Sequence, residues 1–282
     1  MEIKRRNINL NKKTQFTFPK ELEPYKEALE HTVMPFIKMK EQLERTPKIY
    51  ESKLGGNPYL PKSAQHPVDS YKAPMLLLAQ INFTQAPEIE DMPSKGILQF
   101  FITGKEEIDY GQDPDDYTSQ KNFRVVYYED VITDESKLVT DFSYLKQADI
   151  DFDYFPIQRE IALSFEIQEE PLSCEDYRFD ELADSNELLE ALCENDDDFD
   201  LYADLYGKGH KIGGYLSTPQ TDPRAYSEEL AEYDILLLQI DSDENEDQDI
   251  MFGDLGVVNF LIKKKDLRQL NFKDVVYNWS CS

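Results

Sequence analysis

Three short blocks of this sequence recur in the same order in its second half. The pairs are SKLGGNPYLP (52–61) with HKIGGYLSTP (210–219), MLLLAQINF (75–83) with ILLLQIDS (235–242), and GILQFFI (96–102) with GVVNFLI (256–262). The second copies of Gly55, Gln80 and Gly96 lie 158, 159 and 160 positions further along the chain. Because self-similarity at a nearly fixed offset is the signature of a repeated structural unit, these blocks predict an internal duplication.

The duplication also predicts how the chain is divided. No stretch rich in Gly, Ser and Pro is long enough to act as a flexible linker between the copies. We therefore expect a single duplicated domain over residues 1–282, with a first half at 20–178 and a second half at 179–282. The two similar halves should pack together about a pseudo-twofold axis.

Runs rich in β-branched and aromatic residues predict most of the secondary structure. These runs are PMLLLAQINF, GILQFFI, FRVVYYEDV, IALSFEI, ILLLQID, GVVNFLI and VVYNW. Helical periodicity is confined to residues 19–45, where Pro35 should kink or split the helix, and to residues 179–206. Since so few helices cannot serve as crossovers between all the strands, a doubly wound parallel sheet is disfavoured. The predicted class is α+β with mainly antiparallel sheet.

The charge balance argues against several kinds of partner. The chain has 57 acidic and 30 basic residues among 282, a formal net charge of -27, which repels nucleic-acid phosphates and anionic membrane surfaces. No window approaches the roughly 18 apolar residues that a membrane span requires. Cys174, Cys193 and Cys281 form neither a CxxC pair nor an even set, which favours a reducing compartment. We expect a cytoplasmic protein that binds neither nucleic acid nor membrane.

Several stretches resemble the bacterial YwqG family. The motifs that carry the resemblance are SKLGGNPYLPKSAQHP, LLLAQINF, GHKIGGYLSTPQTDPR, LLLQIDSD, MFGDLGVVNFLIKKKDL and the terminal VVYNWSCS, so it runs from about residue 20 to the end. The resemblance implies a cytoplasmic bacterial protein whose α+β fold contains a duplication. It implies no reaction, cofactor or catalytic residue, because none is established for the family. Such families are loosely associated with bacterial toxin and immunity loci.

The Gly-Gly steps, Gly55-Gly56 and Gly213-Gly214, could form phosphate-binding loops or rigid corners. Neither the G-x-x-x-x-G-K-[ST] pattern nor the G-x-G-x-x-G pattern surrounds them. Pro58 follows the first step closely, so no helix N-terminus can open there to present amides to an anion. We favour turns whose glycines adopt positive φ; a ligand-contacting corner is the alternative.

Polar amides interrupt the apolar strand segments at matching places. The duplication aligns Gln80 with Gln239, Asn82 with Asp241 and Gln99 with Asn259. Simple alternation places Leu76, Leu78, Gln80 and Asn82 on one strand face, and Leu237, Gln239 and Asp241 on another. Buried amides must be hydrogen-bonded, so they either cross-link the two half-sheets near the pseudo-axis, which we favour, or line a polar pocket. Since amides are poor acid–base catalysts, such a pocket would bind rather than react.

The second copy contains the best candidate constellation. His210, Asp222 and Arg224 supply an imidazole, a carboxylate and a guanidinium within fifteen residues. The alternative is an Asp-Pro-Arg turn with a capping salt bridge. In FGDLG, a tight bend would point Asp254 towards whatever the second corner faces. The candidate binding residues are His210, Gly213, Gly214, Asp222, Arg224, Gln239, Asp241 and Asp254, and no residue is assigned a catalytic role.

No cofactor or metal site is expected. The segment DSDENEDQD (241–249) has carboxylates at alternate positions, as a calcium loop does. It lacks the central Gly and the closing Glu that an EF-hand loop requires. A solvated hairpin loop is the favoured interpretation.

Two hypotheses about function follow. The first is a non-enzymatic binding protein whose acidic surface recognises a basic protein partner by electrostatic complementarity, with an immunity-like role as one version. The alternative is a small-molecule-binding protein or enzyme with a polar site between the two halves. That alternative requires the second-half candidates to converge on one pocket. Whether the protein is an enzyme is left open, with a non-enzymatic role favoured.

Overall fold

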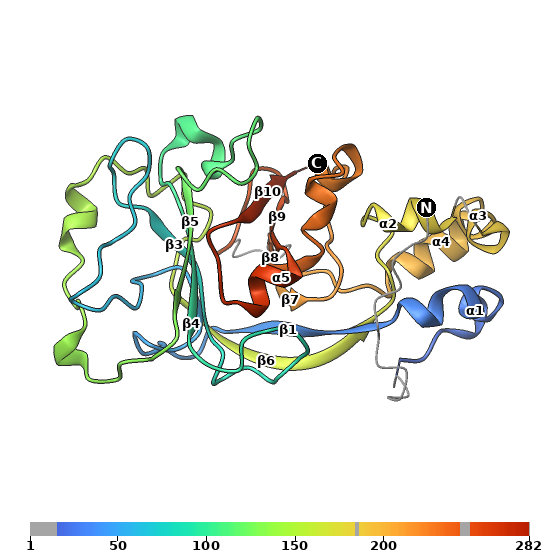
Figure 1. Ribbon diagram of the computed structural model, residues 1–282, viewed down its shortest axis with the longest axis horizontal. Coiled ribbons are helices and arrows are strands. Elements are labelled where there is room, and N and C mark those ends of the chain that lie inside the picture. Colours follow the sequence, from blue (N-terminus) through green and yellow to red (C-terminus); the bar gives the residue numbers. More distant parts are fainter. Residues whose placement is uncertain (1–15, 184–185, 243–248, 282) are drawn as a thin grey trace.

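The computed structural model describes residues 16–183, 186–242 and 249–281, and a single large antiparallel sheet dominates it (Figure 1). Within those residues the sheet has ten strands in the order β10-β9-β8-β7-β1-β6-β2-β3-β4-β5. They are β1 (Met34–Gln42), β2 (Lys53–Leu54), β3 (Leu76–Asn82), β4 (Ile97–Ile102), β5 (Phe123–Tyr128), β6 (Ile161–Glu170), β7 (Lys211–Gly213), β8 (Ile235–Asp241), β9 (Val257–Ile262) and β10 (Val275–Ser280). The predicted α+β class with mainly antiparallel sheet is confirmed, and each strand-rich run of the sequence lies in a strand.

The sheet curls into a nearly closed barrel. β1 and β6 pair along their length and form a central ribbon, and four further strands extend from each side of it (Figure 1). The two sets of strands share one apolar core, in which the rings of Phe100 on β4 and Phe260 on β9 lie 4.8 Å apart. At the seam, the backbone N–H of Tyr277 on β10 donates to the carbonyl of Tyr117 at 2.9 Å. Apolar side chains therefore fill the barrel interior, which buries most of the strand-forming runs.

A helical lobe lies beside one end of the barrel (Figure 1). Its elements are η1 (Lys20–Tyr25), α1 (Lys26–Leu29), η2 (Glu30–Thr32), α2 (Arg178–Ala183), α3 (Glu187–Cys193) and α4 (Asp196–Ala203), and the remaining helices are η3 (Glu106–Gly111), η4 (Glu135–Lys137), η5 (Ser143–Gln147), η6 (Pro223–Tyr226), η7 (Leu230–Glu232) and α5 (Lys264–Arg268). Leu22, Phe179, Leu189 and Tyr202 are among the residues of a separate apolar cluster inside the lobe. In the part of the chain that the structure describes, none of these helices has the length and apolarity needed to cross a membrane.

The helix predicted over residues 19–45 is wrong beyond Thr32. Short helical turns end there, and residues 34–42 form strand β1 instead. Pro35 favours this outcome because a residue that precedes proline is driven towards extended backbone, and because proline is tolerated near a strand start. The apolar side chains of Phe36, Ile37 and Met39 are buried in the sheet.

The helical region predicted at residues 179–206 exists as three short helices rather than one. Asn186 and Asn195 interrupt it, and each side chain caps the helix that follows by accepting a backbone N–H, from Leu188 and from Asp198 respectively. Asparagine competes for backbone hydrogen bonds in this way and favours caps over helix interiors. The last helix ends at Ala203, three residues before the end of the predicted region.

β-bulges change which side chains share a face in the two longest apolar strands. The register shifts between Leu77 and Ala79 in β3, and between Leu236 and Leu238 in β8. After each shift the core-facing positions move by one residue, so that both Leu78 and Ala79 lie in the barrel core. The predicted sharing of a face by Leu78 and Gln80, and likewise by Leu237 and Gln239, is therefore wrong.

Candidate functional site

The structure divides the predicted site residues among three separate networks and one exposed position. Gly213 and Gly214 form a corner in which Gly214 and the N–H of Tyr215 lie against the carboxylate of Glu170. A second group surrounds Gly209, and a third is a set of ion pairs at the base of the helical lobe. Asp254 is exposed. The eight candidates are His210, Gly213, Gly214, Asp222, Arg224, Gln239, Asp241 and Asp254.

The second Gly-Gly corner cradles a carboxylate of the protein itself. Gly213 and Gly214 both have φ near +75°, a conformation that glycine adopts without steric cost. The turn brings Lys211 against Glu170 at the end of β6, with Nζ 3.0 Å from each carboxylate oxygen. Both side chains are fully buried. The corner therefore binds an anion, but the anion is internal.

Backbone donors complete the shell around this carboxylate. The N–H of Tyr215 donates to Glu170 Oε1 at 2.6 Å, and the N–H of Gly207 donates to Oε2. Burial raises the pKa of Glu170 and lowers the pKa of Lys211, while their mutual attraction acts in the opposite direction on each. A fully buried ion pair with this many donors fixes the position of both strands that carry it.

The first corner has the same parts but is less enclosed. Gly55 and Gly56 have φ of +62° and +72°, so the favoured prediction of positive-φ turns is confirmed for both corners. Lys53 Nζ lies 2.7 Å from Glu160 Oε1, with the lysine side chain 1% exposed and the glutamate side chain 28% exposed. Burial lowers the pKa of Lys53.

The strand amides hold the chain that follows each corner. Gln80 accepts the N–H of Tyr59 at 2.7 Å, and Gln239 accepts the N–H of Ser217 at 2.8 Å. Their amide groups donate to the carbonyls of Glu51 at 2.7 Å and Gly209 at 2.9 Å. Gln80 and Gln239 each bond within their own half, so the predicted cross-link between the two half-sheets is wrong for these two amides. They hydrogen-bond to backbone groups that are not paired with a neighbouring strand. Such groups need a partner when they are buried.

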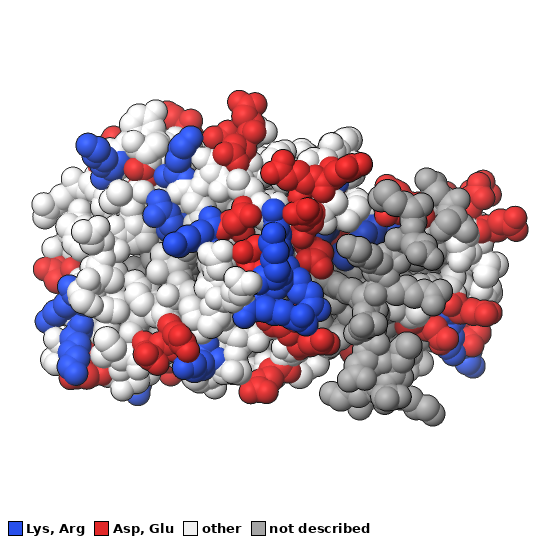
Figure 2. Space-filling model, viewed as in Figure 1, with Lys and Arg blue, Asp and Glu red and all other residues white. Residues whose placement is uncertain are grey.

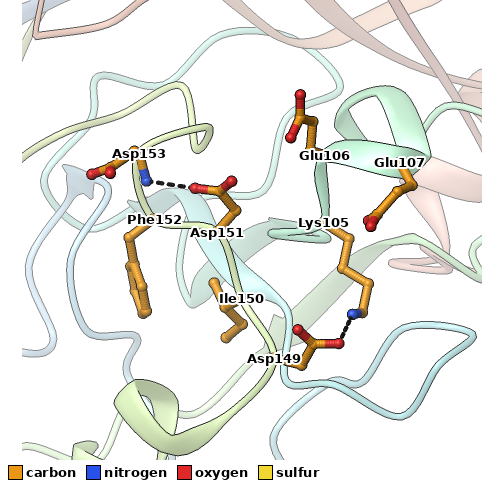
Figure 3. A pocket seen from close by; sticks show the side chains of 8 residues that line it. All are labelled: Lys105, Glu106, Glu107, Asp149, Ile150, Asp151, Phe152 and Asp153. Carbon is orange, nitrogen blue, oxygen red and sulfur yellow. Dashed lines mark hydrogen bonds and ion pairs between the residues drawn. The ribbon is translucent and has the colours of Figure 1, made fainter.

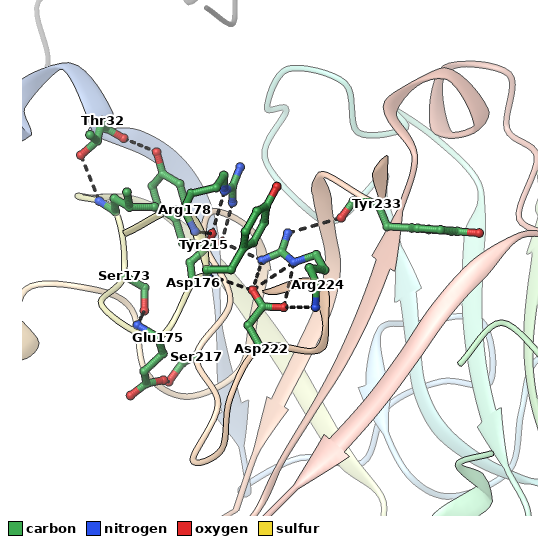
Figure 4. A network of polar contacts seen from close by, with 12 residues as sticks. Thr32, Ser173, Glu175, Asp176, Arg178, Tyr215, Ser217, Asp222, Arg224 and Tyr233 are labelled. Atoms are coloured by element: carbon green, nitrogen blue, oxygen red, sulfur yellow. Dashed lines mark hydrogen bonds and ion pairs between the residues drawn. The ribbon is translucent and has the colours of Figure 1, made fainter. Parts of the chain in front are cut away.

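Asp222 and Arg224 belong to a buried ion-pair network at the base of the lobe (Figure 4). Arg224 Nη2 lies 2.7 Å from Asp222 Oδ2 and 2.8 Å from Asp176 Oδ2, and its guanidinium stacks over the Tyr177 ring at 5.0 Å. Asp222 also caps η6 by accepting the N–H of Arg224 at 3.0 Å. The alternative of an Asp-Pro-Arg turn with a capping salt bridge describes this geometry.

Asp176 receives a second cation from its own segment. Arg178 Nε donates to Asp176 Oδ1 at 2.7 Å. Burial alone would raise the pKa of Asp176, but Arg178 and Arg224 hold it well below its usual range. Four ionised groups therefore join the chain near residue 176 to the chain near residue 224, and the lobe is fixed to the barrel.

The depressed pKa of Asp176 predicts an acid-sensitive contribution to stability. A carboxyl whose folded pKa is lowered stabilises the fold fully above its unfolded pKa of about 3.9, and this contribution falls as pH decreases below that value. The difference in unfolding free energy between wild type and Asp176→Asn should therefore shrink by about 1 kcal/mol from pH 7 to pH 3. Urea unfolding at both pH values measures it. Asp115→Asn, at an exposed position, is the control, and a difference that stays constant for Asp176→Asn contradicts the prediction.

His210 is not part of the Asp222–Arg224 network. Its Nε2 lies 3.0 Å from Glu41 Oε1, and its Nδ1 accepts the N–H of Asp241 at 3.1 Å. Because Nδ1 accepts, the proton sits on Nε2 and faces Glu41. Asp241 in turn accepts the N–H of Gly209 at 2.9 Å. These contacts close a strand end rather than form a catalytic pair.

Within the described residues, no group of three or more His, Cys, Asp and Glu side chains is arranged to hold a metal ion. Residues 243–248 of the acidic segment at 241–249 lie outside the described residues. The prediction of a solvated hairpin loop there is not tested.

A small cavity lies beside the second corner. It has a volume of about 130 Å³ and is lined largely by apolar residues, among them Met34, Met92 and Ile235. A Cβ at Gly213 would come within 2.8 Å of Ile89 Cδ1 on its wall. The polar candidates do not converge on this cavity. It therefore does not meet the requirement of the alternative hypothesis that they share one pocket.

A second, larger pocket has mostly acidic walls and was not predicted from the sequence (Figure 3). It has a volume of about 490 Å³ and is lined by Lys105, Glu106, Glu107, Asp149, Ile150, Asp151, Phe152 and Asp153. Lys105 pairs with Asp149, and Phe152 is 44% exposed. Two segments about forty residues apart form the walls, so no local spacing in the sequence reveals the pocket.

A family model described as "Domain of unknown function (DUF1963)" matches residues 52–281, about four fifths of the chain. The chain belongs to the DUF1963 family. No curated protein matches the sequence.

The DUF1963 match spans both Gly-Gly corners, the strand amides and the ion pairs at the base of the lobe. It begins one residue before Lys53 and therefore leaves out β1. Yet β1 pairs with β6 over nine residues and with β7 over three. In this member of the DUF1963 family, a strand outside the matched region completes the middle of the sheet.

Proposed function

We propose that this DUF1963 protein is a non-enzymatic binding protein of the YwqG type in the bacterial cytoplasm, and that it recognises a basic protein partner. An immunity-like role, in which it masks a basic surface of a toxin, is the version that we favour. The observation that carries the proposal is the set of unpaired carboxylates on the helical lobe.

These carboxylates face solvent from α2, α3, α4 and the turns between and after them. They are Asp180, Glu181, Glu187, Glu190, Glu194, Asp196, Asp197, Asp200 and Asp204. Residues 179–206 contain no Lys or Arg, and in the described part of the chain none of these carboxylates forms an ion pair. Figure 2 shows acidic side chains at the outer end of the lobe. A partner would meet a negative potential that no ion pair among the described residues neutralises.

The support beneath these carboxylates is rigid. The lobe has its own apolar cluster, and the buried pairs of Asp176 with Arg178 and Arg224 join it to the barrel. A preorganised surface binds with a smaller loss of conformational entropy than a mobile one. Charge complementarity on such a surface raises the association rate and selects against acidic partners.

The internal hydrogen bonds and ion pairs of the polar candidates support a binding role over an enzymatic one. The imidazole of His210, the Asp222–Arg224 pair and the Gln239 amide are each engaged by neighbouring groups. General acid–base catalysis needs a titratable group within reach of a substrate. The cavity beside the second corner offers apolar walls instead.

Recurring contacts support the proposal that residues 20–178 and 179–282 are copies of one unit. The lysine before each Gly-Gly step has a buried side chain that pairs with a glutamate, Lys53 with Glu160 and Lys211 with Glu170, although both glutamates lie in the first half. Each set of strands also has a β-bulge in its first long strand and an amide that accepts an N–H from the chain after the corner. We propose on this basis a duplicated domain with a pseudo-twofold relation between its halves.

Charge removal on the lobe tests the binding proposal. The lobe variant carries Glu187→Gln, Glu190→Gln, Asp196→Asn and Asp197→Asn. The wild-type chain is first used to capture proteins from bacterial extract at low salt, and the affinity of a captured protein is then measured for wild type and for the lobe variant. We expect a basic protein whose affinity weakens by at least about tenfold in the lobe variant and falls with added salt.

A matched variant controls for net charge. Glu106→Gln, Glu107→Gln, Asp115→Asn and Asp130→Asn remove the same charge at exposed positions on the barrel, and this control should bind the same partner as wild type. If no basic protein is captured, or if both variants lose it equally, the lobe is not the recognition surface.

A further inference from the structure

One buried amide oxygen on β9 has no partner. Asn259 is 1% exposed, and its Nδ2 donates to the carbonyl of Ser217 at 3.0 Å. Its Oδ1 is enclosed and accepts no hydrogen bond from any described residue. Since a buried acceptor without a donor costs free energy, such an atom needs an explanation.

A second amide lies directly opposite. Asn278 on β10 is the cross-strand partner of Asn259 and is 6% exposed. Within the described residues its side chain takes part in no hydrogen bond. Side chains at directly opposite positions have Cβ atoms about 4.5–5.5 Å apart. The enclosed oxygen of Asn259 and the amide of Asn278 therefore lie opposite each other on the outer face of the sheet.

The corresponding ladder between β4 and β5 is built differently. Gln99 lies opposite Val126 there, and although Gln99 Oε1 also lacks a partner, its neighbour offers no polar group. The rings of Tyr59 and Tyr128 fill that side, with centroids 5.2 Å apart.

Small polar residues stand in the matching places next to Asn278. The hydroxyls of Thr218 and Ser280 lie 2.6 Å apart. The Ser217 hydroxyl donates to Glu175 Oε2 at 2.5 Å. Side chains smaller than the tyrosine rings of the first half therefore stand on this side of the β9–β10 ladder.

We propose that the recess between β9, β10 and residues 217–218 binds a small hydrogen-bond donor of the size of water or an ammonium ion. Asn259 Oδ1 accepts one hydrogen bond from it, and the Asn278 amide supplies the second contact. Enclosure of Asn259 Oδ1 restricts the occupant to one of this size. The slight exposure of Asn278 gives the route of entry.

A crystal structure of the whole chain at high resolution tests the proposal. We expect density for one occupant within hydrogen-bond distance of Asn259 Oδ1 and the Asn278 amide, and no such density in Asn278→Val, which copies the Val126 arrangement. Direct bonding between the two asparagines, or an empty recess in wild type, overturns the proposal. The wild-type structure decides this even if the variant does not fold.

Thermal unfolding distinguishes the two occupants. Wild type and Asn278→Val are compared in ammonium chloride and in sodium chloride at equal ionic strength. If ammonium is bound, it raises the Tm of wild type alone by at least about 2 °C. Equal Tm values in the two salts, together with the density, assign the occupant as water.

Discussion

Replacement of Lys211 by Met is expected to lower the free energy of unfolding by about 3–5 kcal/mol. The substitution leaves the Glu170 carboxylate buried without the lysine that pairs with it, and both groups are fully enclosed. The backbone N–H groups of Tyr215 and Gly207 cannot neutralise the charge. Urea unfolding at pH 7, followed by circular dichroism, measures the loss.

Two comparisons separate burial from the mere presence of an ion pair. Lys40 and Glu166 also pair on the β1–β6 ribbon, but their side chains are 49% and 37% exposed. Lys40→Met should therefore change stability far less. The double variant with Glu170→Gln and Lys211→Met should recover part of the loss, because it removes the buried charge and keeps an acceptor for Tyr215. Equal effects of Lys211→Met and Lys40→Met would show that the buried pair contributes no more than a surface pair.

Replacement of Gly214 by Ala should destabilise the protein by about 3–5 kcal/mol through two effects. Its φ of +75° lies in the left-handed region, which costs an L-residue about 1–2 kcal/mol. A Cβ there would also lie 2.0 Å from Glu170 Oε1, so the buried carboxylate must move away from its donors. The decrease in the urea concentration at the unfolding midpoint measures the sum of the two effects.

Gly209 provides a matched control for the backbone effect. It has φ of +84°, and a Cβ at this position would meet nothing within 4 Å. Gly209→Ala should therefore cost only about 1–2 kcal/mol. If Gly214→Ala costs no more than Gly209→Ala, the close approach of the carboxylate is not a constraint on the corner.

The sequence predicted the parts of the fold that depend on local pattern. Runs of β-forming residues located the strands, and the Gly-Gly steps located two turns with positive φ. Residues 34–42 were wrongly predicted to be helical. The adjacent apolar residues Phe36 and Ile37 fit a helix, but they also fit a strand with both faces buried at that point. The bulges in β3 and β8 escaped prediction because one inserted residue leaves composition unchanged.

The site depends on contacts that sequence pattern does not contain. Gly214 was predicted to matter, but its partner Glu170 lies 44 positions earlier and ends a strand that simple alternation already explains. Asp176 likewise reaches Arg224 across 48 positions. Several polar candidates of the second copy hydrogen-bond one another instead. Only tertiary contact separates a group that is engaged internally from one that is free to bind.

The position of β1 has a consequence for synthesis. This strand leaves the ribosome early, but its neighbours in the sheet, β6 and β7, begin at Ile161 and Lys211. At translation rates of about 5–20 residues per second, roughly ten seconds pass between the appearance of β1 and that of β6. During that interval the buried face of Ile37 and Met39 has no partner, and an unpaired strand is prone to aggregation. The nascent chain therefore exposes its central strand until the middle of the sheet can close.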